Sequence, residues 1–304
     1  MTKTKVIIIF KAFITIGLLM LLAKNIDINE TLRHLERFKL PFLFFALCVL
    51  AVQALVITLR WKIILFHLDL SYSFSNLLRY FWSGSFFNQA LPSSIGGDAL
   101  RGYYIYKDGA KPKDAVLSVL IDRLFGVTGL TILVILMFPS LLTQEGFVDL
   151  KNSIFIVIFG TSIIVVTAFS LDLFVKIKSW KVIRGLLHLS YESRNMLLTS
   201  FDGFKLSILS IIVHLCSVAT VFIIAMGMGL SLSWYSVIII IPLVSLVMVA
   251  PISIAGWGVR ESSMVFGLGY FGVNPEHALA LSLAYGLTAL IVTIPGLFFW
   301  LADR

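Results

Sequence analysis

The chain has 304 residues, of which 59% are hydrophobic and 13% are charged, and its mean hydropathy is +0.99. A soluble globular domain has about 25% charged residues, so this composition excludes a soluble enzyme or a soluble binding module. The formal net charge of +8 does not indicate nucleic-acid binding, because Lys and Arg accumulate in the cytoplasmic loops of membrane proteins. We therefore predict one all-α integral membrane domain over residues 1–304, with no soluble domain.

Apolar runs of about 20 residues, long enough to cross a hydrocarbon core of about 30 Å, recur along the chain. Lys11 interrupts the first of them, and we expect its side chain to snorkel to the membrane surface. The fold class is a polytopic helical membrane protein with about seven to eight transmembrane helices. Seven runs are expected to be full spans, at residues 5–23, 41–59, 115–138, 153–171, 206–229, 235–250 and 277–301.

Two segments, at residues 76–114 and 251–276, are too apolar for ordinary loops and too interrupted for ordinary spans. We expect each to be a broken or re-entrant segment that enters the membrane and returns. Non-helical backbone at membrane depth is tolerated only where it is buried in protein or lines a water-filled cavity. The two segments therefore mark the functional interior of the predicted bundle.

The two segments carry the same short pattern, PSSIGGDALR at residues 92–101 and PISIAGWGVRE at residues 251–261. In both copies a serine follows the proline by two residues and an arginine follows it by nine. Each copy then reaches a second proline with an acidic residue and an alanine, in PKDA at 112–115 and PEHA at 275–278. Paired Gly/Pro interruptions in two halves of a membrane chain indicate a transporter's binding site.

Each break is expected to precede a new helix that carries Arg101 or Arg260. A helix N-terminus presents free N–H groups and a positive dipole end, which suits an anion such as a lipid phosphate. A guanidinium binds phosphate bidentately and strengthens such a site. The alternative is a pair of interfacial turns whose arginines snorkel to headgroups.

Other charged residues lie near the two patterns. Asp122 and Arg123 are adjacent and point to different faces of a helix, so each is expected to find a partner elsewhere, as in Asp122 with Arg101 or Asp98 with Arg123. Such pairs either hold the bundle together or handle substrate or protons. Glu261 either binds a cationic headgroup, takes a coupling proton or pairs locally with an arginine.

Among the polar residues of the apolar segments, Asn88, with Gln89, precedes the first break and binds either a headgroup or a neighbouring helix. His214 is expected to make one interhelical hydrogen bond. The sequence contains no nucleotide-binding fingerprint, metal-ligand cluster or Ser/His/Asp constellation with supporting context. No catalytic residue, metal or cofactor is therefore predicted.

The distribution of Lys and Arg indicates the orientation in the membrane. With the N-terminus in the cytoplasm and both interrupted segments returning, 16 of these residues fall on the inner side and six on the outer side. This bias favours a cytoplasmic N-terminus in the cytoplasmic membrane. Four full spans would then separate the two interrupted segments, so both would enter from the same side, and an inverted pair requires one of them to cross.

These motifs resemble those of the lysylphosphatidylglycerol synthase transmembrane family, and the resemblance extends over nearly the whole chain. It is carried by FNQALP at residues 87–92, GGDALR at 96–101 and the second pattern at 251–261, where the family usually has Gly-Gly or Gly-x-Gly followed by Arg-Glu. It continues at Ala115, Ser118, Asp122, Arg123 and Gly126.

The resemblance implies a lipid flippase. In members such as the multiple peptide resistance factor, this kind of domain moves aminoacylated phospholipid between leaflets, and a separate cytosolic domain makes that lipid. The present chain ends at Arg304, directly after the last predicted span, so we do not expect synthase activity. Stand-alone members are associated with glycolipids or polyprenyl-linked intermediates.

We therefore predict a flippase that moves the headgroup of an anionic phospholipid, glycolipid or polyprenyl-linked lipid across the cytoplasmic membrane. One alternative is a membrane-embedded glycosyltransferase or lipid-modifying enzyme, whose carboxylate base would be Asp27 or Glu30. Another is a non-catalytic subunit of an envelope complex. The expected partners are a membrane lipid and either a second copy or an envelope-biosynthesis protein, and not nucleic acid. The candidate substrate-binding residues are Asn88, Gly96, Gly97, Asp98, Arg101, Asp122, Arg123, Gly256, Arg260 and Glu261.

Overall fold

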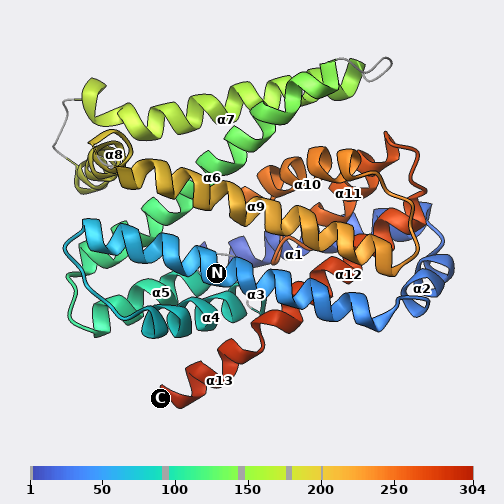
Figure 1. The fold of residues 1–304 in the computed structure, drawn as a ribbon, viewed down its shortest axis with the longest axis horizontal. Coiled ribbons are helices and arrows are strands. Elements are labelled where there is room, and N and C mark those ends of the chain that lie inside the picture. The colour runs from blue at the N-terminus through green and yellow to red at the C-terminus, as the bar shows by residue number, and fades with distance from the viewer. Residues whose placement is uncertain (1–2, 91–95, 143–147, 176–179, 200, 304) are drawn as a thin grey trace. The chain divides into compact units, whose positions relative to one another are not determined.

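The computed structural model of the chain describes residues 3–90, 96–142, 148–175, 180–199 and 201–303, and the elements in these ranges are all helices, as predicted (Figure 1). The chain forms two compact units. Unit 1 comprises Met1–Leu55, Leu78–Arg101 and Leu215–Arg304. Unit 2 comprises Val56–Leu77 and Gly102–His214. Unit 1 thus contains both copies of the repeated pattern.

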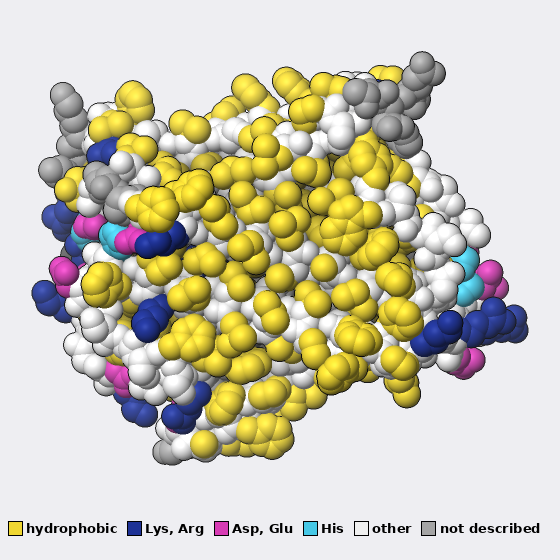
Figure 2. Space-filling view, viewed as in Figure 1, with side chains coloured by type: hydrophobic (Ala, Val, Ile, Leu, Met, Phe, Trp, Pro, Cys, Tyr) yellow, Lys and Arg dark blue, Asp and Glu magenta, His cyan; other side chains and the backbone are white. Residues whose placement is uncertain are grey.

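The helices confirm a polytopic membrane protein. Hydrophobic side chains cover most of the face that Figure 2 shows, as expected for a surface in contact with lipid. In the described residues, five helical segments are long and apolar enough to span a membrane: α3 (Leu40–His67), α6 (Pro112–Leu142), α7 (Val148–Phe174), α9 (Phe201–Gly227) and α12–α13 (Pro275–Thr293 and Pro295–Ala302). A sixth span is present if α1 (Lys3–Asn25) and α2 (Ile28–Glu36), which are bent by 93° to each other, count as one.

The second interrupted segment contains α11 (Val259–Gly269), which folds back on α10 (Trp234–Val249) to form a hairpin. The rings of Tyr235 and Phe271 lie 6.1 Å apart, and nearer the tip a Cβ atom on Gly267 would lie 2.8 Å from Ile240. The two arms are therefore antiparallel. Residues 235–250, expected as a full span, are one arm of this hairpin. At 1.5 Å per residue an arm of 16 residues is about 24 Å long, too short for a core of about 30 Å.

The first interrupted segment also folds back on itself, as α4 (Phe74–Ala90) and α5 (Gly96–Lys107). Asn88 Oδ1 accepts a hydrogen bond of 2.8 Å from the Gly97 amide, and the Arg101 guanidinium lies 5.3 Å from the centre of the Phe81 ring. These contacts place successive residues of α5 beside earlier residues of α4. The predicted break at residues 93–97 falls mainly in residues 91–95, which lie outside the described residues. The new helix predicted after it is confirmed.

Within unit 1, residues 78–101 of the first hairpin and the second hairpin approach the α12–α13 segment from opposite ends. Arg79 of α4 lies by the C-terminal end, because it forms an ion pair with Asp303. One turn further along α4, the Trp82 indole donates to the Val292 carbonyl at 3.0 Å. The base of the second hairpin leads directly into the first residue of α12, Pro275. The two hairpins therefore point toward each other. The count of four full spans between them included α10, which is too short to be one, and the side from which each hairpin enters stays a prediction.

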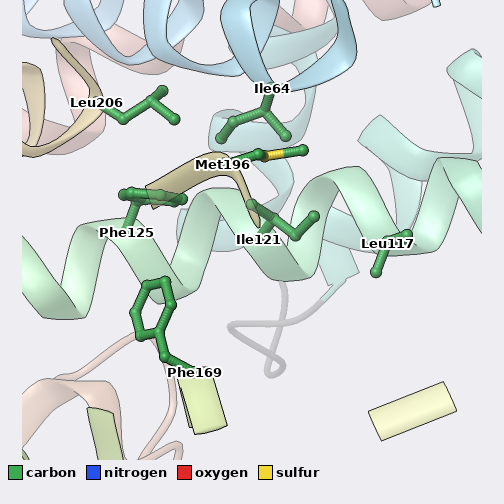
Figure 3. Packing of buried hydrophobic residues seen from close by; sticks show 7 residues of the cluster. All are labelled: Ile64, Leu117, Ile121, Phe125, Phe169, Met196 and Leu206. Atoms are coloured by element: carbon green, nitrogen blue, oxygen red, sulfur yellow. The ribbon is translucent and has the colours of Figure 1, made fainter. Parts of the chain in front are cut away.

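Unit 2 has its own hydrophobic core, drawn in Figure 3, where α3, α6, α7, α8 (Lys181–Thr199) and α9 contribute side chains. The rings of Phe125 and Phe169 meet edge to face, with centroids 5.7 Å apart, in the geometry that aromatic pairs prefer. This core holds α6, the helix that carries Asp122 and Arg123. Its buried members are Ile64, Leu117, Ile121, Phe125, Phe169, Met196 and Leu206.

Candidate functional site

A cavity of about 240 Å³ lies in unit 1, where the tips of the two hairpins meet the middle of α12. The first hairpin contributes Gln89, one residue before the end of α4. The other polar side chains of the lining come from the second hairpin and from α12. They are Ser245, Arg260 and Tyr285, and the remaining surface is mostly apolar, with Met248 and Ala255 among its residues. A mostly apolar cavity with a few polar groups is typical of small-molecule binding sites.

The tip of the second hairpin is a break in the helix, as predicted. Between Ala250 and Gly258 the backbone is not helical, and Ala255, Gly256 and Gly258 have φ values of 49°, 81° and 82°. Glycine adopts such values without strain, which explains two of the three positions. The Thr15 hydroxyl of α1 accepts a hydrogen bond of 3.0 Å from the Ile254 amide. The break is therefore held from the side of α1 as well as from α11.

Arg260 and Glu261 form a buried ion pair directly after this break. Arg260 Nη2 lies 2.6 Å from Glu261 Oε1, and the two side chains are 3% and 0% exposed. The Ser282 hydroxyl of α12 donates to the same carboxylate oxygen at 3.1 Å. The guanidinium also lies 4.5 Å from the Trp257 ring and 6.0 Å from the Tyr285 ring, within the range of cation–π attraction. Because Arg260 lines the cavity, this network connects the break to the cavity wall.

Glu261 makes the local pairing with an arginine that was one of its three possible roles, and this bears on the predicted anion site. Glu261 Oε2 accepts a hydrogen bond of 2.6 Å from the Gly258 amide, so the carboxylate of the chain itself caps the start of α11. A carboxylate near a helix N-terminus satisfies a free N–H group and the positive dipole end. Arg260 is neutralised by the same group. A lipid phosphate would therefore compete with Glu261 at this helix start, which the pattern of residue types did not reveal.

The first copy of the pattern is arranged in a related way. Gly96 is the first residue of α5, and the Gly97 amide is already bonded to Asn88. Arg101 Nη1 lies 3.6 Å from Asp98 Oδ1, and both side chains are buried. Asn88 therefore makes the interhelical hydrogen bond that was the alternative to a headgroup contact. Each copy delivers one buried arginine with a carboxylate beside it.

Asp122 lies in unit 2 and is bound to Arg60 of α3. Arg60 Nε donates to Asp122 Oδ1 at 2.8 Å, and Arg60 Nη1 donates to the Ser210 hydroxyl at 3.0 Å. His214 makes one hydrogen bond of 2.9 Å, to the Gly126 carbonyl, as predicted. Arg123 follows Asp122 and is exposed. The pairings Asp122 with Arg101 and Asp98 with Arg123 would join the two units and stay predictions.

Two further residues were given roles from the sequence. The expected snorkelling of Lys11 stays a prediction, and the residue as a whole is 8% exposed. Asp27, a candidate catalytic base, is the N-cap of α2, where its carboxylate accepts hydrogen bonds from the Asn29 and Glu30 amides at 2.8 and 3.1 Å. Such a cap satisfies otherwise free N–H groups of a helix start. The carboxylate of Asp27 therefore has a structural role as the cap of α2.

Sequence reasoning missed Arg60, Ser282 and Tyr285. Arg60 lies one residue past the run 41–59 that was expected as a span, and the continuation of the apolar run past it, as α3, was the available signal. Ser282 and Tyr285 lie in an apolar helix with no local feature to mark them. In the described part of the chain, no group of three or more His, Cys, Asp or Glu residues is arranged to hold a metal ion.

Comparison with known proteins gives one match. A family model described as the lysylphosphatidylglycerol synthase TM region matches residues 8–296, which covers both hairpins and the spans between them. No curated protein matches the chain.

Proposed function

The chain belongs to the lysylphosphatidylglycerol synthase TM region family, which is associated with lipid translocation, and from this premise we propose that it is a flippase of the cytoplasmic membrane. Its proposed substrate is an anionic phospholipid, glycolipid or polyprenyl-linked lipid. The polar headgroup would cross through the protein while the apolar chains stay in the bilayer. The site would be the cavity of unit 1.

The observation that carries this proposal is the place of the cavity between two facing hairpin tips. Discontinuous helices that meet inside a membrane protein are the usual construction of a transport site. Gln89 from one tip and Arg260 from the other line the same cavity of about 240 Å³. This volume suits a phosphate with its neighbouring polar atoms and not a pair of acyl chains. Ser245 and Tyr285 supply further hydroxyl groups for hydrogen bonds.

The opposite direction of the hairpins supports transport over simple binding. Three candidate spans, α6, α7 and α9, separate the hairpins in the chain. An odd number of crossings means that the hairpins enter from opposite faces of the membrane. Inverted repeats of this kind let a site open alternately to either side. With a cytoplasmic N-terminus, the C-terminus is also cytoplasmic, so Arg304 joins the positively charged inner side.

A liposome assay tests the proposal. The purified protein is reconstituted in vesicles that contain trace amounts of a lipid with a fluorescent headgroup, and an impermeant quencher reports the fraction exposed outside. Vesicles with protein should expose the inner pool of at least one anionic lipid faster than empty vesicles do. A variant that removes both charges of the buried pair, Arg260→Met with Glu261→Gln, should be slower. Equal rates with and without protein, across phospholipids, glycolipids and polyprenyl phosphates, would refute the proposal.

A lipid-modifying enzyme is the second class considered from the sequence. Of its two candidate bases, Asp27 caps α2, and Glu30 lies 3.7 Å from His34 on the same helix. No observation in the described residues favours chemistry at these carboxylates. The flippase is therefore the function that the site supports best.

A further inference from the structure

A second cavity, of about 330 Å³, lies in unit 2 where the C-terminal end of α7 meets α8. Its lining residues are Asp172, Val175, Arg184, Leu187, His188 and Tyr191. Arg184, His188 and Tyr191 follow one another by four and three positions, so they lie on one face of α8. Because α7 and α9 are both candidate spans, the segment that connects them lies at a membrane surface. The cavity therefore lies outside the membrane-spanning helices, apart from the proposed transport site in unit 1.

The carboxylate in the lining of this cavity is already neutralised. Asp172 Oδ1 lies 2.7 Å from Arg194 Nη1 and accepts a hydrogen bond of 2.8 Å from the Ser190 hydroxyl. The guanidinium of Arg194 compensates the negative charge at the atom that carries these bonds. Asp172 therefore does not prevent an anion from entering the cavity, as a lone carboxylate would.

The connecting segment as a whole has more positive than negative charge. Residues 172–205 contain six Lys and Arg residues and three acidic residues. Each acidic residue lies within 4 Å of a basic side chain, in the pairs Asp172–Arg194 at 2.7 Å, Glu192–His188 at 3.6 Å and Asp202–Lys205 at 2.8 Å. Arg184 belongs to none of these three pairs, and it lies in the wall of the cavity. The remaining positive charge of the segment thus includes a guanidinium at a binding-sized hollow.

The surroundings of the cavity favour a lipid over a free anion. α8 exposes the apolar side chains of Val182, Leu186 and Leu198, and Trp180 just before it is also exposed. Exposed apolar side chains on a helix that also carries basic residues are typical of a helix in the interfacial plane of a bilayer, and Trp is enriched at that level. α8 is therefore suited to lie among the headgroups, where the phosphates of lipids are concentrated.

We propose that this cavity binds the phosphate of an anionic lipid at the membrane surface on which α8 lies. The Arg184 guanidinium binds two phosphate oxygens, and the Tyr191 hydroxyl donates a further hydrogen bond. Val175 and Leu187 provide apolar surface for the adjoining glycerol and first methylene groups. In the proposed orientation this surface is cytoplasmic, where anionic lipids attract basic segments. The inference goes beyond the proposed function and does not require that any lipid be moved.

Hydrogen–deuterium exchange on the full chain tests this site, because it locates the response on α8. The protein is held in micelles of an uncharged detergent, and dioctanoylphosphatidylglycerol is titrated. Exchange of the α8 amides should slow with increasing lipid. The half-maximal concentration should rise about tenfold or more in Arg184→Gln, and about fivefold in Tyr191→Phe, which keeps the ring. Arg33→Gln removes an exposed arginine of α2 and should respond as the wild type does.

Two further probes identify the ligand chemistry. Dioctanoylglycerol, which lacks the phosphate, and inorganic phosphate, which lacks the chains, should each leave α8 exchange unchanged at the concentrations that saturate the phosphatidylglycerol response. An equal response to dioctanoylglycerol would show that the phosphate is not recognised. An equal response to inorganic phosphate would show a site for a free anion and overturn the assignment to a lipid.

The variants provide the remaining outcomes. Equal half-maximal concentrations for Arg184→Gln and the wild type would remove Arg184 from the site and overturn the proposal. If Arg184→Gln already exchanges faster without lipid, its fold is disturbed and Tyr191→Phe decides: an unchanged half-maximal concentration in that variant would also overturn the proposal.

The same measurement separates this site from the proposed flippase. The double variant Arg260→Met with Glu261→Gln alters the cavity of unit 1 and should leave the lipid response of α8 unchanged. Loss of the α8 response in that variant would mean that the lipid binds in unit 1, and the site on α8 would fail. If no lipid is translocated in vesicles while the Arg184-dependent response persists, the flippase fails and the site on α8 stands.

Discussion

Gly286 of α12 lies directly against the guanidinium of Arg260, so that a Cβ atom at residue 286 would lie 2.6 Å from Arg260 Cζ. A separation under 3 Å leaves no room for a methyl group, and the guanidinium would have to move. Its hydrogen bonds to Glu261 and Ser282 fix where it lies. The glycine on α12 and the ion pair on α11 are therefore parts of one arrangement at the cavity wall.

The first prediction concerns this contact. Gly286→Ala should lower both the melting temperature and the translocation rate, because the displaced Arg260 side chain loses its hydrogen bonds to Glu261 and Ser282. Alanine in place of glycine normally favours a helix by roughly 0.5–1 kcal/mol, so a loss of stability here identifies the overlap. Gly269→Ala is the control, since no atom lies within 4 Å of that Cβ position. Equal behaviour of the two variants in thermal unfolding and transport would contradict the prediction.

The second prediction concerns the buried pair of Arg260 and Glu261. Glu261→Gln keeps an acceptor for the Gly258 amide but leaves Arg260 as an uncompensated charge, which should cost about 3–5 kcal/mol. Adding Arg260→Met should recover much of that loss, because the charge is then removed as well. Thermal or denaturant unfolding in one detergent measures both variants.

A matched control for this pair is Asp303→Asn, which breaks the more exposed ion pair with Arg79. Partly exposed pairs contribute little, so this change should cost under about 1 kcal/mol. A double variant that is less stable than Glu261→Gln alone would show that Arg260 contributes more through Trp257, Tyr285 and Ser282 than through its charge pair.

How far the sequence predicts this fold depends on the kind of signal. The second break and the helix that carries Arg260 were predictable, because glycines at positive φ and a proline mark a local change of backbone. The course of α10 was not predictable from the sequence, because an apolar run has the same composition whether its helix crosses the membrane or turns back. Only its length of 16 residues favoured a hairpin arm.

The roles of buried charges were less predictable than their presence. Asp122 and Lys11 were recognisable as ionisable groups in apolar runs. The Arg60 partner of Asp122 lies on another helix, and no pattern within one helix specifies such a contact. Tertiary packing therefore decides which partner a buried charge finds, even where its presence in an apolar run is clear from the sequence.

The third prediction separates two roles of Asn88. Its side chain accepts from the Gly97 amide at the start of α5, so Asn88→Ala should destabilise the protein by about 1 kcal/mol, as for a lost helix cap. Asn88→Asp keeps the acceptor and places a negative charge at the helix start, which is favourable. The aspartate variant should therefore resemble the wild type in melting temperature. If it is stable but no longer translocates an anionic lipid, Asn88 contacts the headgroup and the cap is not its main role.

The fourth prediction concerns membrane topology. If the hairpins enter from opposite faces, the residue that precedes α6 and the residue that precedes α12 are exposed on opposite sides. Single cysteines at Lys111 and Asn274, both exposed, are suitable positions in a background where Cys48 and Cys216 are replaced by alanine. In intact cells an impermeant maleimide should label Asn274→Cys, because the proposed orientation places the start of α12 outside, and Lys111→Cys should react only after the membrane is opened. Labelling of both cysteines from one side would mean that an even number of spans separates the hairpins. The alternating-access argument would then lose its inverted repeat, while the contacts inside unit 1 would remain as they are.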